Sequence, residues 1–287
     1  MMKRILFFDI DGTLAIPGQE PSKETVDAIR AARANGHKAI LCTGRTEHNV
    51  PDSVRKIGFD GGIYSAGGRI IVDGKTISNR AMPRDMVEMI VSALQKEQST
   101  FTLECLNKNY VGGADLRMLE SLDVTNSNSE LQRMLAGFDQ SPFAEYDNEP
   151  VYKVSFLATS REQIDRIAGS LDDRVKVVTF DNLRSDFPLL AGEVSDKHIH
   201  KGMALQCVCD CFGVSSELSV AFGDSMNDEE MLLTAGIGVA MGNSVEQVKA
   251  LANQVCESCA DNGVAKTLIR LGLTDSVPPR SAAAASS

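Results

Sequence analysis

Four short apolar runs, each ended by a polar turn, constrain the fold of this chain most. They cover residues 5–8, 39–42, 218–222 and 237–241 and show almost no alternation of apolar and polar residues. Runs of this kind are typical of strands buried on both faces, as in a parallel sheet covered by helices. Helical patterns lie between them, so strand and helix alternate. The sequence therefore predicts an α/β fold with a Rossmann-like parallel sheet as its core.

Serine residues mark the starts of three predicted helices. Ser22 precedes an apolar stripe and is expected to cap it. Ser160 with Gln163, and Ser244 with Gln247, match the spacing of a capping box, in which serine and glutamine side chains satisfy the free N–H groups of the first turn. We expect helices to begin directly after these serines.

The middle of the chain has a different pattern. Helical stripes begin at Pro83 and Ser160, and the strand candidates around them are 101–106, 110–112, 151–157 and 175–180. This order predicts an α+β domain inserted into the α/β core, and the stretch 107–148 between these elements is too polar to assign.

The chain length supports two units, because 287 residues exceed the commonest size of a domain with a single core. We expect a discontinuous core of residues 1–82 and 188–273 and an inserted cap domain of residues 83–187. Residues 274–287 contain two prolines and an alanine run, which predicts a flexible tail.

Charge narrows the range of partners. Lys and Arg number 29 against 39 Asp and Glu, a formal net charge of −10. Nucleic acids and anionic membranes bind largely through basic side chains, so neither is expected as a partner.

The apolar start of the chain is broken by Asp9 and Asp11 too early for an export signal, and no apolar run approaches the roughly 18 residues of a membrane span. Seven cysteines without a regular framework favour reduced thiols, so we expect a soluble cytoplasmic protein.

Acidic residues follow two of the predicted strands. Asp9 and Asp11 come directly after the first apolar run, and Asp224 and Asp228 come after the third. Ligands of open α/β sheets bind beyond the carboxyl ends of the strands, so these four carboxylates are expected to meet at one edge. Clustered carboxylates repel one another and require a cation. The oxygen-rich set predicts Mg²⁺.

The residue types at this edge suit phosphoryl chemistry. Asp9 and Asp11 project from the same side of an extended chain, so one carboxylate could attack phosphorus while the other donates a proton to the leaving oxygen. Thr43 can donate a hydroxyl hydrogen bond to a phosphoryl oxygen, and Lys201 can neutralise the charge that develops there.

These residues lie in segments that resemble the four motifs of the haloacid dehalogenase superfamily, in the right order. The segments are 7–14 (FFDIDGTL), 41–45 (LCTGR), 201–202 (KG) and 223–228 (GDSMND). The long insertion between the second and third motifs is similar to that of the Cof-type phosphatases, which carry a type IIB α+β cap at this position.

The resemblance implies a Mg²⁺-dependent phosphatase, a phosphoric monoester hydrolase, acting on a small phosphorylated metabolite such as a sugar phosphate. It implies Asp9 as the nucleophile that forms an aspartyl-phosphate and as a metal ligand. It implies Asp11 as the general acid/base, which also binds the metal through its backbone carbonyl, and Asp224 as the remaining protein ligand.

Other roles follow from the same resemblance. Thr43 and Lys201 would hold the phosphoryl group together with Gly44 and Arg45, and Arg45 would face the substrate. Asn227 is placed among the substrate-binding residues, and with Asp228 it would orient Lys201 and metal-bound water.

One segment departs from the family pattern. Cof-type proteins usually carry an Asn-Gly pair after the third core strand, whereas residues 64–68 here are YSAGG. Ala66 stands where the amide is expected, which puts in doubt any substrate contact made there. In the inserted domain, Lys153 is expected to be solvated or salt-bridged more than to meet a substrate.

Two other functions are compatible with these motifs. A sugar phosphomutase would use the same aspartates but would need a bisphosphorylated activator and would return phosphate to the sugar. A phosphoacceptor signalling module shares the sheet, the acids and Mg²⁺, but such modules are much shorter and lack an acid two residues beyond the acceptor. The identity of the substrate and the oligomeric state are not predicted from the sequence.

Overall fold

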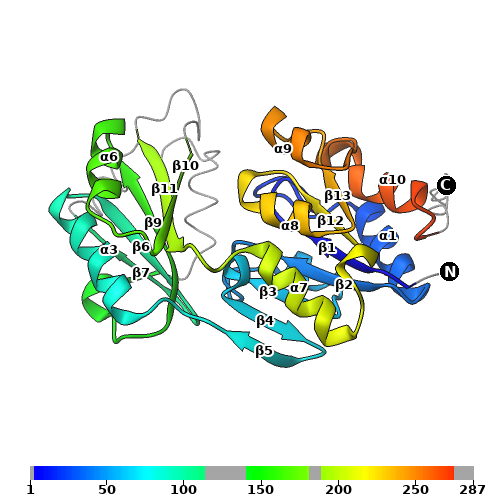
Figure 1. Ribbon diagram of the computed structural model, residues 1–287, viewed down its shortest axis with the longest axis horizontal. Coiled ribbons are helices and arrows are strands. Elements are labelled where there is room, and N and C mark those ends of the chain that lie inside the picture. Colours follow the sequence, from blue (N-terminus) through cyan, green and yellow to red (C-terminus); the bar gives the residue numbers. More distant parts are fainter. Residues whose placement is uncertain (1–2, 114–139, 181–188, 275–287) are drawn as a thin grey trace, which may run out of the picture.

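The computed structural model describes residues 3–113, 140–180 and 189–274, and in this part of the chain it contains two separate sheets (Figure 1). The first sheet has the order β14-β13-β12-β1-β2-β3-β4-β5. In chain order its strands are β1 (Ile5–Phe8), β2 (Lys38–Cys42), β3 (Gly61–Tyr64), β4 (Arg69–Val72), β5 (Lys75–Asn79), β12 (Ser219–Gly223), β13 (Ile237–Ala240) and β14 (Gln254–Val255). Neighbours from β14 to β3 are parallel, and β4 and β5 extend the sheet in antiparallel fashion.

The central strands are buried because helices cover both faces of this sheet. On one face lie α1 (Lys23–Ala34), α2 (Asp52–Arg55) and α10 (Gly263–Arg270), and on the other lie α7 (Lys201–Phe212), α8 (Glu229–Thr234) and α9 (Glu246–Leu251). Every residue of β1 is buried. Phe8 stacks on Phe222 of β12 with ring centroids 5.3 Å apart. The predicted parallel α/β core is therefore confirmed, as the absence of alternation in its strands indicated.

The second sheet has the order β10-β11-β9-β6-β7-β8. Its strands in chain order are β6 (Thr100–Cys105), β7 (Asn109–Gly112), β8 (Gln140–Pro142), β9 (Val151–Ala158), β10 (Val175–Phe180) and β11 (Leu190–Asp196). All neighbours are antiparallel except β7 and β8. Helices α3 (Arg84–Lys96) and α6 (Arg161–Gly169) pack on one face, so the inserted segment has the expected α+β build.

Strand β11 differs from the expected division of the chain. Its residues were assigned to the second core segment, 188–273, but β11 pairs with β9 and β10 in the second sheet. Residues after β11 return to the first sheet and begin α7 at Lys201. The inserted sheet therefore continues to Asp196, beyond the expected boundary at residue 188. The expected tail, apart from Thr274, lies outside the described residues.

Two of the three predicted serine caps are confirmed. The side chain of Ser22 accepts a hydrogen bond from the Thr25 N–H, and that of Ser160 accepts one from the Gln163 N–H. The expectation for Ser244 is wrong, because α9 begins at Glu246 with Val245 at its N-cap. None of the described helices is long and apolar enough to cross a membrane.

Asp60, just before β3, connects α1 to the first sheet through hydrogen bonds. Its carboxylate accepts hydrogen bonds from Arg33 at 2.9 and 3.2 Å, from Lys38 at 3.1 Å and from the Ala39 N–H at 3.0 Å. Burial alone would raise the pKa of Asp60, but these hydrogen bonds outweigh it and lower the pKa below its ordinary value. The ionised form therefore stabilises the fold.

Asp60→Asn should reduce the free energy of unfolding by about 1–3 kcal/mol at neutral pH, because it removes hydrogen bonds to a charged group. Since the folded pKa is lowered, the difference from wild type should be complete above about pH 5 and should shrink as the pH falls below about 4. Urea unfolding of wild type and Asp60→Asn across this pH range measures the difference in the free energy of unfolding. Asp73→Asn is the control, because Asp73 is 62% exposed and lies 3.7 Å from Lys38. A difference that grows on acidification would contradict the account.

Candidate active site

The predicted site residues converge at the carboxyl edge of the first sheet. Asp9 follows β1, Thr43 follows β2, Asp224 follows β12, and Lys201 is the first residue of α7. Because β12, β1 and β2 are adjacent and parallel, their ends bring together residues that are more than 200 positions apart in the sequence.

Lys201 is the centre of this cluster. Its side chain is 0% exposed, and Nζ donates hydrogen bonds to Asp9 Oδ1 at 2.6 Å and to Asp228 Oδ1 at 2.5 Å. A third, longer contact of 3.3 Å reaches Asn227 Oδ1. Burial alone would lower the pKa of Lys201, but the carboxylates of Asp228 and Asp9 raise it, so the ammonium stays charged.

Asp228 is fully occupied by the protein itself. While Oδ1 binds Lys201, Oδ2 accepts from the N–H groups of Asp224 at 3.0 Å and Ser225 at 3.2 Å. The carboxylate is completely buried. Asp228 therefore holds both Lys201 and the turn that carries Asp224.

Three carboxylates at this edge could hold a metal ion. One oxygen each of Asp9, Asp224 and Asp228 lies within 4.8 Å of the others. Burial, and after it the charge of Asp228, raises the pKa of Asp224 to about 7. The pKa of Asp9 is likewise raised well above its ordinary value, mainly by burial, with Lys201 opposing the rise. Three acids against one ammonium leave excess negative charge, which a divalent cation would neutralise.

The donor set fits Mg²⁺ through two of these acids. Asp228 has both oxygens committed, whereas no hydrogen bond to Oδ2 of Asp9 or of Asp224 is found within the described ranges. Oxygen ligands from two carboxylates, with waters completing the shell, suit this ion. Thr13 holds Asp224 in place, since its hydroxyl donates to Asp224 Oδ1 at 3.0 Å.

Gly12 makes room for the Asp224 carboxylate. Its φ is +82°, and a Cβ at this position would lie 2.2 Å from Asp224 Oδ2. Any larger residue would have to displace that carboxylate as well as adopt a strained backbone. The glycine of the first motif is thus explained by a close approach between two distant segments.

Asp11 and Arg45 form a pair that the sequence did not predict. Arg45 Nε donates to Asp11 Oδ2 at 2.7 Å and Nη2 donates to Asp11 Oδ1 at 2.8 Å. Arg45 was expected to face the substrate, but in this structure it binds Asp11. Asp11 is accordingly directed toward the loop after β2, and its carboxylate is 39% exposed, unlike the buried acids.

The remaining polar groups leave donors available. Thr43 Oγ1 accepts from the Arg45 N–H at 3.1 Å, which leaves its hydroxyl hydrogen free to donate. Asn227 Oδ1 accepts from Ser225 Oγ at 2.8 Å, so its Nδ2 remains a donor. A Cβ on Gly44 would lie 3.5 Å from that Nδ2, so these residues are neighbours.

The turn after β3 supports the loop that carries Thr43. The Ala66 N–H donates to Thr43 O at 2.9 Å, and the Ser65 N–H donates to Arg45 O at 2.8 Å. Ser65 and Ala66 have φ values of +49° and +54°. Asparagine tolerates this left-handed region better than alanine, so the departure from the family pattern places a less suitable residue at a strained position.

Two further positioning residues escaped the sequence reasoning. His200 caps α7, its ring Nδ1 accepting from the Met203 N–H at 3.2 Å directly before Lys201. Asn243 bridges two loops, because its Nδ2 donates to Gly12 O and its Oδ1 accepts from the Cys259 N–H, each at 2.9 Å. A serine before a helical stripe, such as Ser160, can be predicted to cap the helix. Histidine is not among the usual capping residues, so the role of His200 could not be predicted in this way.

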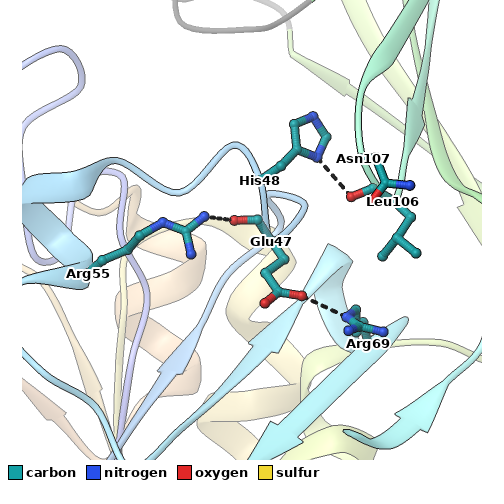
Figure 2. Close-up of a pocket in the computed structure, with 6 residues that line it drawn as sticks. All are labelled: Glu47, His48, Arg55, Arg69, Leu106 and Asn107. Atoms are coloured by element: carbon teal, nitrogen blue, oxygen red, sulfur yellow. Dashed lines mark hydrogen bonds and ion pairs between the residues drawn. The ribbon is translucent and has the colours of Figure 1, made fainter. Parts of the chain in front are cut away.

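A polar pocket of about 310 Å³ lies where the two sheets meet (Figure 2). It is lined by Glu47, His48, Arg55, Arg69, Leu106 and Asn107. Figure 2 shows His48 directed at the turn after β6, where its Nδ1 lies 3.1 Å from Leu106 O. The loop after β2 thus runs from the catalytic edge to a contact with the inserted sheet.

Comparisons with known proteins identify relatives over nearly the whole chain. A family model described as haloacid dehalogenase-like hydrolase matches residues 6–268. The chain is 26% identical over 269 residues to a 5-amino-6-(5-phospho-D-ribitylamino)uracil phosphatase of Bacillus subtilis (strain 168), covering 92% of this chain and 96% of the relative. It is 25% identical over 264 residues to a phosphoglycolate phosphatase of Methanobrevibacter smithii, covering 91% and 94%. A solved structure described as a HAD subclass IIB sugar phosphatase superposes with a TM-score of 0.77 at 25% identity, over 94% of this chain and 100% of that one.

Gly12→Ala should destabilise the protein more than Gly74→Ala does. Both glycines have positive φ, +82° and +75°, but nothing lies within 4 Å of a Cβ on Gly74. The backbone strain alone should cost about 1–2 kcal/mol in each variant, and the clash with Asp224 should add about 1–3 kcal/mol. Denaturant unfolding of both variants measures the difference, and equal losses would show that Gly12 is not fitted to Asp224.

Proposed function

The chain belongs to the haloacid dehalogenase-like hydrolases, and we propose that it hydrolyses a small phosphorylated metabolite through an aspartyl-phosphate formed on Asp9. It is a phosphatase of that family, as its named relatives are. The observation that carries the proposal is the buried contact of Lys201 with Asp9, which leaves one oxygen of the carboxylate open to a substrate.

Mg²⁺ is the proposed cofactor, held by Asp9 and Asp224, with the backbone carbonyl of Asp11 as a third protein ligand. When bound, it would neutralise charge on the phosphoryl oxygens and draw the phosphate to the acidic edge. The buried excess of negative charge around Lys201 supports this assignment.

Asp9 is the proposed nucleophile. Lys201 takes up one lone pair of Asp9 Oδ1. A carboxylate oxygen has a second lone pair, so Oδ1 could also serve the metal ion, and Oδ2 is the oxygen that would attack phosphorus. The bond from phosphorus to the leaving oxygen breaks as the new bond to Asp9 forms, and the phosphoryl group is carried on the carboxylate until water attacks it. Burial keeps bulk water from competing at this step, since Asp9 is only 5% exposed.

Asp11 is the proposed general acid/base. It would donate a proton to the leaving oxygen in the first step and accept one from the attacking water in the second. Its carboxylate is 39% exposed and lies outside the buried acid cluster, and it would turn from Arg45 toward the leaving group when substrate is present.

The phosphoryl oxygens would be bound by donors that the structure leaves available. These are the Thr43 hydroxyl, the Asn227 amide and the Lys201 ammonium, with the backbone at Gly44 close by. Fixed donors aimed at the transferring group stabilise the charge in its transition state. Asp228 would act through Lys201 by holding the ammonium in place.

The second sheet, with α3 and α6, is proposed to act as a cap that restricts the site to small phosphorylated metabolites, sugar phosphates among them. A cap of this size excludes water during transfer and must open for release. The seven free thiols support the expected cytoplasmic location.

Asp9→Asn should reduce phosphate release by at least about 1,000-fold, because an amide cannot serve as the nucleophile. Release of inorganic phosphate from p-nitrophenyl phosphate with Mg²⁺ measures it, and EDTA should abolish the wild-type activity. Asp73→Asn is the matched control, since Asp73 is exposed and far from the catalytic edge in the turn between β4 and β5. Wild-type turnover by the Asp9→Asn protein would overturn the covalent mechanism.

A further inference from the structure

The second sheet carries a cluster of charged residues that the proposed mechanism does not use. Glu104 on β6, Lys153 on β9 and Glu193 on β11 occupy three adjacent strands. Lys153 Nζ lies 2.7 Å from Glu193 Oε1 and 3.3 Å from Glu104 Oε1. The side chains are 14%, 12% and 26% exposed for Lys153, Glu104 and Glu193. We call these three residues the cap cluster.

The cap cluster lies on the sheet face that the helices leave uncovered. Successive side chains of a strand point to opposite faces. Leu103, Val154 and Val194, each next in sequence to a cluster residue, belong to the apolar core with α3 and α6. Figure 1 shows these two helices on the side of the second sheet that is away from the first sheet. The cap cluster is therefore on the face turned toward the catalytic core.

One contact between the two sheets brings the cap cluster near the catalytic edge. The backbone carbonyl of Leu106, two residues beyond Glu104, accepts a hydrogen bond from Nδ1 of His48, in the loop after β2 (Figure 2). The same loop carries Arg45. Burial lowers the pKa of Arg45, but the nearby carboxylates of Asp11 and, more weakly, Glu104 raise it. Glu104 thus lies within electrostatic reach of the residue that holds Asp11.

Stability alone does not explain such a cluster. A buried ion pair rarely stabilises a fold more than apolar residues of the same volume would. The cap cluster also has unequal charges, one ammonium against two carboxylates. Ser155 Oγ donates to Glu104 Oε1, yet no hydrogen bond to the Oε2 atom of either glutamate is found in the parts of the chain that are described. Two acceptor oxygens are therefore left for a ligand.

We propose that the cap cluster selects substrates whose leaving group is neutral and rich in hydroxyl groups, and rejects those that carry a second anionic group. Hydroxyl groups can donate to the two open carboxylate oxygens, whereas a carboxylate or second phosphate meets the excess negative charge. This inference rests on the proposed function and adds to it the residues that choose among its substrates by the charge of the leaving group. Bisphosphorylated compounds, which a mutase requires as activators, are disfavoured by the same charge.

Sorbitol 6-phosphate and 6-phosphogluconate form a matched pair of substrates, because they differ only in a terminal hydroxymethyl group against a carboxylate. Wild type should hydrolyse sorbitol 6-phosphate with a kcat/KM at least about 10-fold higher, the size expected for one hydrogen bond to a charged group. This comparison needs no variant. Equal values, or no hydrolysis of sorbitol 6-phosphate, would overturn the inference.

Glu193→Gln removes one negative charge at nearly constant volume and should lower the ratio of the two kcat/KM values by about 5- to 10-fold, mainly by improving 6-phosphogluconate. Using the ratio cancels any general loss of activity. Glu97→Gln is the matched control, since Glu97 pairs with Arg166 of α6 on the helix-covered side of the cap. In Glu97→Gln the ratio of the two kcat/KM values should equal that of wild type. An unchanged ratio in Glu193→Gln, with hydrolysis still dependent on Asp9, would refute the inference and leave the proposed function intact; hydrolysis independent of Asp9 would refute the proposed function.

Discussion

The buried ammonium of Lys201 is the interaction on which the rest of the site depends. It lies between Asp9 and Asp228, and both contacts are formed without access to solvent. Removing the Lys201 ammonium would leave two buried carboxylates without their partner, which is among the most costly changes a protein interior can undergo. The arrangement also commits both oxygens of Asp228 within the protein: they hold the lysine and the backbone of the turn after β12. The excess of negative charge that remains is what makes a divalent cation and an anionic substrate compatible with an acidic protein.

Much of this could be predicted from the sequence, because the governing signals are local. A strand covered on both faces is apolar throughout, so β1, β2, β12 and β13 are recognisable as short runs. Residues that follow parallel strands must share one edge of the sheet, so the convergence of Asp9, Thr43 and Asp224 follows from the topology. The inserted α+β segment was also recognisable, since the order of its helical stripes and strand candidates differs from that of the core.

Other features could not be predicted, because they depend on side-chain directions and strand register set by the whole fold. Arg45 is two residues from Thr43, yet the sequence does not say whether it points to a substrate or to Asp11. The expected boundary at residue 188 leaves β11 in the core, because only its pairing with β9 and β10 shows which sheet it joins. Lys153 was expected to be salt-bridged more than substrate-binding; it is salt-bridged, and its partners come from two strands whose register brings them beside it.

The central claim is that phosphate passes through the carboxylate of Asp9. Its most direct test is to quench turnover of the wild-type protein within milliseconds, reduce with borohydride and map the modified residue by peptide mass spectrometry. An acyl phosphate is reduced by borohydride to an alcohol, whereas a free carboxylate is not. We expect the conversion at Asp9 alone, only when substrate is present, and none in Asp9→Asn. Modification at Asp11, or none at any aspartate during steady phosphate release, would contradict the account.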